Sequence, residues 1–230
     1  MTGPAHENSY VISYLNLRRA IGILGMALPF ILVLGSVFTS GCQDIQSSIS
    51  YYYHTGMRNA FVGILCIVAL FLFSYRGPQF IDNLMGDLAC IFALGVAFLP
   101  TGAEFPTPDC TISPLVNNPL AGKLHLVSAS LFFLILSYFS IFLFRKTDNP
   151  ETATRQKLKR NKIYLVCGII MLSCLALIAV YMLFFYDHFP ALHSYKPVFW
   201  LETIALLAFG FSWLIKGDTL FQDVEHSRIV

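Results

Sequence analysis

Six long apolar stretches run through the chain, and each is about long enough to cross a lipid bilayer. They cover residues 20–38, 59–75, 84–99, 124–144, 163–185 and 198–215. A transmembrane helix needs roughly 20 predominantly apolar residues. The stretches are continuous rather than alternating, and an open sheet in lipid would leave its backbone groups unsatisfied. The pattern predicts an all-α membrane protein, with six transmembrane helices in one bundle and a single domain over residues 1–230.

The composition agrees with a lipid environment. Of the 230 residues, 56% are hydrophobic and 12% are charged, and the mean hydropathy is +0.66. Soluble domains carry about 25% charged residues, so this chain has roughly half the charge that keeps such a domain in solution. The first apolar stretch is too long for the core of a cleavable signal peptide. These features argue against a soluble enzyme and against a secreted one.

Basic residues are distributed very unequally between the two sets of loops. Twelve belong to segments on the same side as the N-terminus: Arg18, Arg19, Arg76, Arg145, Lys146, Arg155, Lys157, Lys159, Arg160, Lys162, Lys216 and Arg228. Only Arg58, Lys123 and Lys196 belong to the other side. Cytoplasmic loops carry the excess of Lys and Arg, so we expect both termini in the cytoplasm. Anionic lipid explains the basic loop at 145–162 better than nucleic acid does.

Two of the six cysteines, Cys42 and Cys110, fall in the loops predicted to lie outside. The outer side of a bacterial inner membrane is oxidising. We therefore expect a disulfide between Cys42 and Cys110. The other four, Cys66, Cys90, Cys167 and Cys174, lie inside the apolar stretches and are expected to pack as small apolar residues.

Three ionisable residues at or near membrane depth form the candidate site. Glu202 lies about 8 Å inside the last apolar stretch, His125 begins the fourth, and His54 precedes the second. Such residues are costly in lipid and usually functional. With helical spacing, Ser50, His54 and Arg58 would share one face. Ser50, Arg58, Asn59 and Ser128 are therefore expected to line a substrate pocket with His54, His125 and Glu202.

Several chemistries suit this set of residues. Imidazole and carboxylate ligands at His54, His125 and Glu202 would suit zinc or iron. The same three residues could instead act as catalytic acid and base groups at the outer leaflet. A haem held by His54 and His125 is a weaker alternative. The simplest alternative is structural, with Glu202 paired to Arg58 or His125 and locking the bundle.

Other residues have expected structural roles. Asp87 is expected to pair with Arg18, Arg19 or Lys162. Small residues at Gly22, Gly25 and Gly86, with Pro29, are typical of close helix contacts or kinks. The tyrosines at 51–53 fit an aromatic belt at the membrane interface, and the histidines at 188 and 193 are expected to be solvated.

Three segments carry a resemblance to known families: Ser50-Tyr-Tyr-Tyr-His54-Thr-Gly-Met-Arg58-Asn59, Ser74-Tyr-Arg-Gly and Phe199-Trp-Leu-Glu202. Through them the chain resembles a family of bacterial six-span membrane proteins that has no assigned activity. The element Ser50-x-x-x-His54 also resembles the alkaline ceramidase and adiponectin-receptor superfamily of seven-span zinc hydrolases. The closely following Asp and the terminal His-x-x-x-His of that superfamily are missing here.

Two functions are consistent with these observations. The first is an integral protein of the bacterial inner membrane that binds a small ligand, lipid or metal in an outer pocket, with metal-dependent lipid hydrolysis as its catalytic form. The second is a structural or accessory subunit of a larger membrane complex. Membrane lipid, a membrane-protein partner or a second copy of the chain in a homo-oligomer are the partners to expect; nucleic acid is not. A transporter is disfavoured because paired broken helices and inverted halves are not evident.

Overall fold

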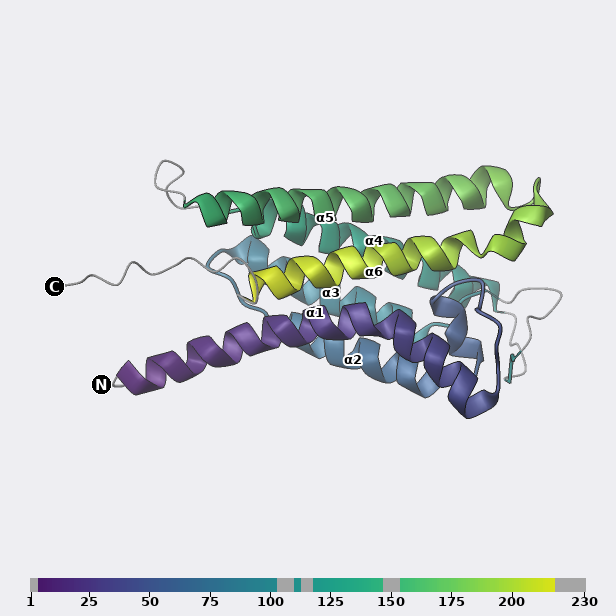
Figure 1. Ribbon diagram of the computed structural model, residues 1–230, viewed down its shortest axis with the longest axis horizontal. Helices are drawn as coiled ribbons and strands as arrows, with labels where there is room; N and C mark the ends of the chain where they lie inside the picture. Colours follow the sequence, from purple (N-terminus) through teal and green to yellow (C-terminus); the bar gives the residue numbers. More distant parts are fainter. Residues whose placement is uncertain (1–3, 103–109, 113–117, 147–153, 218–230) are drawn as a thin grey trace.

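The described residues of the chain form an all-helical bundle without strands (Figure 1). This computed structural model describes residues 4–102, 110–112, 118–146 and 154–217, and their side chains from Tyr14 onward except at Ser40. The long helices are α1 (Pro4–Ser40), α2 (Arg58–Ser74), α3 (Phe80–Phe98), α4 (Pro119–Tyr138), α5 (Arg155–Val180) and α6 (Pro197–Lys216). Short 3₁₀ helices are η1 (Ser50–His54) and η5 (Pro190–Tyr195). The π-helical turns η2 (Phe139–Leu143) and η4 (Tyr181–Phe185) extend α4 and α5.

Five of these segments are long and apolar enough to cross a membrane. They are Tyr14–Thr39, Phe80–Phe98, Pro119–Leu143, Arg155–Phe185 and Pro197–Lys216. The second predicted span corresponds to α2, which is apolar but has 17 residues. The chain is therefore an integral membrane protein by the length and composition of its helices.

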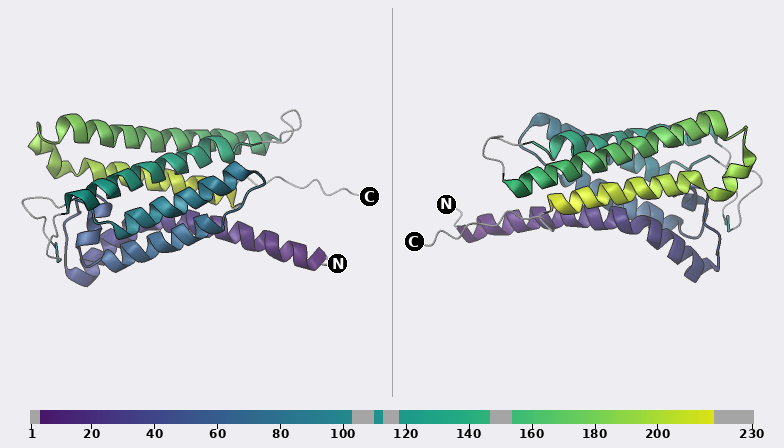
Figure 2. Two further views of the ribbon diagram at one scale, coloured as in Figure 1. Left: turned by 180° about the vertical axis from the view of Figure 1, so that it is seen from behind. Right: turned by 45° about the horizontal axis from the view of Figure 1, so that its top comes forward.

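The six helices form a closed ring in sequence order. Each packs against its neighbours in the chain, and α6 closes the ring by packing against α1. Figures 1 and 2 show α5, α6 and α1 on one side of the bundle and α4, α3 and α2 on the other. The ring brings the polar residues of α4 and α6 to the same end, although 60 or more positions separate them.

Small residues allow the contact that closes the ring. A Cβ atom on Gly22 would lie 2.7 Å from the backbone oxygen of Gly210 in α6, and one on Gly25 would meet the ring of Phe209. A Cβ atom on Gly86 would meet the backbone oxygen of Leu72 in α2. The predicted helix contacts at these glycines are confirmed. Pro29 lies within α1, which is visibly bent (Figure 1).

The two ends of the bundle differ in chemistry, and we name them accordingly. The disulfide end contains the C-terminal end of α1, η1, the start of α4 and the start of α6. It carries a disulfide between Cys42 and Cys110, whose Cα atoms are 5.8 Å apart, so this predicted pairing is confirmed. The basic end contains the Arg and Lys residues assigned above to the N-terminal side, apart from Arg228, which lies outside the described residues.

Hydrogen bonds and ion pairs hold the helix ends together at the basic end. Arg19 donates to the carbonyl of Gly217, Lys146 pairs with buried Asp82 at 2.6 Å, and Arg76 pairs with Asp87 at 2.7 Å. The expected pairing of Asp87 with Arg18, Arg19 or Lys162 was wrong, because the turn after α2 places Arg76 beside it. The carboxylate of Asp82 also accepts a hydrogen bond from the amide of Gln79 and so caps α3. The helix therefore begins at Phe80, before the predicted start at residue 84.

Aromatic side chains pack together in the core near the basic end. Tyr75, Phe139, Phe144 and Trp213 are buried, and the centroid of the Trp213 ring lies 5.1–5.5 Å from those of the other three. Edge-to-face contacts of this kind favour a single packing arrangement. The core near the basic end is therefore filled by packed rings.

Candidate functional site: a cavity between α4, α5 and α6

A cavity with a volume of about 440 Å³ opens at the disulfide end. Ligand pockets in proteins typically measure about 300–1,000 Å³. We call it the α4–α6 cavity. Its apolar walls come from α4, α5, η4 and α6, and include Leu126, Ala129, Ile178, Met182 and Val198. Its polar residues include Ser50, Lys123, His125, Lys196 and Glu202.

Glu202 lies in α6 and is held by the backbone of the loop before η1. Its Oε2 accepts a hydrogen bond of 2.6 Å from the amide of Ile49, and the amide of Ser50 also interacts with the carboxylate. A second hydrogen bond joins the same two segments in the opposite direction. The amide of Phe199 in α6 donates to the carbonyl oxygen of Ser47 in the loop, at 3.0 Å. The expected pairing of Glu202 with Arg58 or His125 was wrong, because backbone amides take that position.

His125 lies in the second turn of α4 and is buried. Its Nδ1 lies 2.9 Å from the carbonyl oxygen of Leu99, just after α3. A carbonyl oxygen only accepts hydrogen bonds, so Nδ1 carries the proton and Nε2 of the neutral ring is the acceptor. The ring lines the α4–α6 cavity, so Nε2 is the nitrogen left to interact with what the cavity holds.

His54 is buried but does not line the α4–α6 cavity. Its Nε2 lies 3.1 Å from the carbonyl oxygen of Thr101, two residues beyond the carbonyl that His125 binds. The carbonyl of His54 accepts from the amide of Ile112. His54 therefore joins η1 to the segment after α3 and to the segment that follows Cys110.

The predicted metal site at His54, His125 and Glu202 is not formed. Across the described residues, three or more His, Cys, Asp or Glu side chains nowhere gather so as to hold a metal ion. Each of the three instead binds a backbone group. The predicted helical spacing of Ser50, His54 and Arg58 also fails, because η1 ends at His54 and a turn separates it from α2.

The four predicted pocket residues are divided between different places. Ser50 lines the cavity beside Glu202. Arg58 and Asn59 are exposed at the start of α2, and the Arg58 guanidinium binds the hydroxyl of Tyr53 and lies over its ring. Ser128 is buried against Gly95 of α3.

Several cavity residues were not predicted from the sequence. Tyr181, Tyr186 and His193 form an aromatic wall, with the rings of Tyr186 and His193 stacked at 4.5 Å. His193 binds the carbonyl of Tyr186 at 2.8 Å, whereas it was expected to be solvated. Lys196 has a left-handed backbone conformation, φ 51°, which is uncommon for a residue other than glycine. In the sequence, the proline at 197 was the signal that a turn precedes α6.

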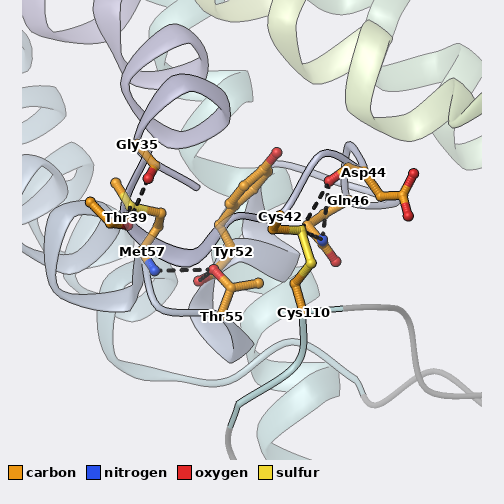
Figure 3. Close-up of a disulfide and its surroundings, with 9 residues drawn as sticks. All are labelled: Gly35, Thr39, Cys42, Asp44, Gln46, Tyr52, Thr55, Met57 and Cys110. Carbon is orange, nitrogen blue, oxygen red and sulfur yellow. Dashed lines mark hydrogen bonds between the residues drawn. A yellow bond between two sulfur atoms is a disulfide. The ribbon is translucent and has the colours of Figure 1, made fainter. Parts of the chain in front are cut away.

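The disulfide holds the loop that carries this site (Figure 3). Cys42 is buried, and Gln46 donates to the carbonyl of Asp44 beside it. Tyr52 is fully buried behind this loop, and its neighbours Tyr51 and Tyr53 are also buried. The expected interfacial belt at these tyrosines was wrong, because η1 turns inward and becomes part of the core. The five prolines of the loop at 100–123 predict a cap at this end, and residues 103–109 and 113–117 of that loop lie outside the described residues.

Comparison with protein-family models, with curated proteins and with solved structures gave no match. The class that the fold defines is a polytopic α-helical membrane protein with a cavity at one end.

Proposed function

We propose that this chain is a six-span protein of the bacterial inner membrane that binds one small amphipathic ligand, of the size of a lipid headgroup and the adjoining chain, in the α4–α6 cavity. The single observation that carries the proposal is the cavity itself, which combines about 440 Å³ of space with apolar walls and a few convergent polar groups. This combination is typical of small-molecule sites.

We count α2 as the sixth span. Since α1 ends at the disulfide end and α3 begins at the basic end, the chain has to cross the bundle between them. The 17 residues of α2 are at the lower limit of about 17–25 for a transmembrane helix. Six spans leave both termini on one side, and the basic residues favour the cytoplasm for that side.

Binding is better supported than passage through the bundle. The rings of Tyr75, Phe139, Phe144 and Trp213 pack against one another in the core at the basic end. A ligand that enters the cavity from the disulfide end or from lipid meets this packed cluster before it could reach the other side. We therefore favour a receptor, carrier or enzyme-like pocket over a channel.

The experiment compares the ligand bound to the purified wild-type protein with the ligand bound to three variants. Ala129 faces the cavity, whereas Val127 on the same helix is exposed. A129F should reduce the lipid that co-purifies with the protein in native mass spectrometry, and V127F should leave it unchanged. I178W is a second filling variant, from α5. Equal lipid in all four proteins would overturn the proposal.

The second candidate function is an accessory subunit. It is favoured by the finding that His54, His125 and Glu202 all bind backbone groups, as residues that stabilise a bundle do. The same mass spectra test it. A stable second protein or a second copy of the chain, with an empty cavity, would favour the subunit.

A further inference from the structure

Three residues that line the α4–α6 cavity carry acceptor groups that indicate which ligand chemistry it takes, and we call Glu202, His125 and Ser50 its floor. This inference rests on the proposed function. Glu202 uses part of its carboxylate on backbone amides, and a carboxylate has about four acceptor positions. His125 has its Nε2 acceptor left to the cavity because Leu99 holds Nδ1. The hydroxyl of buried Ser50 adds a third group that can accept.

Positive charge lies at the rim of the same cavity. Lys123 is the fifth residue of α4, and Lys196 is the residue before α6. Neither forms an ion pair with any residue in the described ranges. Lys196 precedes Glu202 by six residues, so they are separated by about 9 Å along the axis of α6. The lining thus carries a carboxylate at Glu202 and ammonium groups at Lys123 and Lys196, which we call the rim.

We propose that the cavity recognises a zwitterionic headgroup in which a primary ammonium is joined to a phosphate, as in phosphoethanolamine. The ammonium has three N–H donors, which match the acceptors of Glu202, His125 and Ser50. The phosphate then lies toward Lys123 and Lys196, and the acyl chain lies along the apolar wall formed by Leu126, Ile178 and Met182. A trimethylated ammonium has the same charge and no donor, so it leaves these acceptors unsatisfied.

The test measures the affinity of the purified full chain for short-chain lipids by titration calorimetry in detergent. The probes are dihexanoyl phosphatidylethanolamine, phosphatidylcholine and phosphatidylglycerol. A lost hydrogen bond to a charged group costs about 1.5–3 kcal/mol, so phosphatidylethanolamine should bind at least about tenfold more tightly than phosphatidylcholine. E202Q should weaken the binding of phosphatidylethanolamine by a larger factor than that of phosphatidylcholine, and so reduce this preference.

Matched control variants distinguish the contribution of the floor residues to lipid binding from that of the rim lysines. D187N removes an exposed carboxylate at the same end and should change nothing. K123Q should weaken all three lipids by a similar factor, whereas R58Q, which removes a cation that interacts with Tyr53, should weaken none. Water-soluble phosphoethanolamine is a further probe. Weaker binding than the lipid supports a membrane source, and equal binding supports the same headgroup chemistry from a soluble source.

The outcomes distinguish this inference from the proposed function. If A129F blocks binding of all lipids but the wild-type protein binds phosphatidylethanolamine and phosphatidylcholine equally, the headgroup assignment is wrong and the ligand cavity stands. If the wild-type protein binds none of the probes and retains no lipid, the proposed function is wrong as well.

Discussion

The carboxylate of Glu202 in α6 accepts a hydrogen bond of 2.6 Å from the backbone amide of Ile49, which is 153 positions earlier in the chain. This bond places a membrane-depth acid at the meeting point of α6 and the loop before η1. It also joins the loop that carries Cys42 to the helix that closes the ring. The same residue therefore stabilises the fold and lines the cavity.

Replacement of Glu202 by alanine should lower the free energy of unfolding by about 1–3 kcal/mol, since the amide of Ile49 loses its acceptor. E202Q should cost much less, because its side-chain carbonyl can accept the same hydrogen bond. Thermal unfolding in detergent measures both, with D187A as the exposed control. Equal destabilisation by E202A and E202Q would contradict the role of the hydrogen bond and point to the charge.

The two buried histidines should be replaceable by amides of matching length. The side-chain nitrogen of asparagine can take the place of Nδ1 in His125, and that of glutamine the place of Nε2 in His54. H125N and H54Q should therefore retain most of the stability. H125L and H54L should each lose about 1–3 kcal/mol, because a carbonyl of Leu99 or Thr101 loses its donor. Amide variants as unstable as the leucine variants would rule out these bonds as the reason for burial.

Non-reducing mass spectrometry should find Cys42 linked to Cys110, and the C42S/C110S variant should be less stable. The two cysteines are 68 positions apart, for which the chain-entropy model gives a contribution of about 4 kcal/mol. C66S, which changes an unpaired cysteine in α2, is the control. Free alkylation of both Cys42 and Cys110 without reductant would disprove the link.

G22A should be strongly destabilising, by about 1–3 kcal/mol, because its methyl group would lie 2.7 Å from a backbone oxygen that has little room to move. Gly63 in α2 is the matched control, since nothing lies within 4 Å of a Cβ atom there. G63A should stabilise α2 by about 0.5–1 kcal/mol. Unfolding curves of the two variants in one detergent make the comparison, and similar curves would show that α1 and α6 do not meet at Gly22.

Reporter fusions should place both the C-terminus and Asn149 in the cytoplasm, and Asn117 on the other side. The physical reason is the excess of Lys and Arg at the basic end. Replacing Arg155, Lys157, Lys159 and Arg160 together by glutamine should weaken this preference. A C-terminal fusion that reports the outer side would contradict the six-span topology.

The all-helical fold and the disulfide could be predicted from the sequence because each depends on local information. A continuous apolar run specifies a helix in lipid through its own backbone hydrogen bonds. Cys42 and Cys110 were the two cysteines outside the apolar runs, so the side of the membrane was enough to pair them. The glycines at 22, 25 and 86 also indicated close packing without naming the helix they meet.

The tertiary structure alone decided which polar residues share the cavity. Helical spacing suggested one face for Ser50, His54 and Arg58, but η1 ends at His54 and a turn follows it. His54 therefore binds the carbonyl of Thr101, and Arg58 binds the hydroxyl of Tyr53. The positions of Lys196 and His193 follow from the turn before Pro197 and from the packing of α5 on α6, and the proline was their one signal in the sequence. Helix identity is a property of consecutive residues, whereas a cavity depends on how six helices close into a ring.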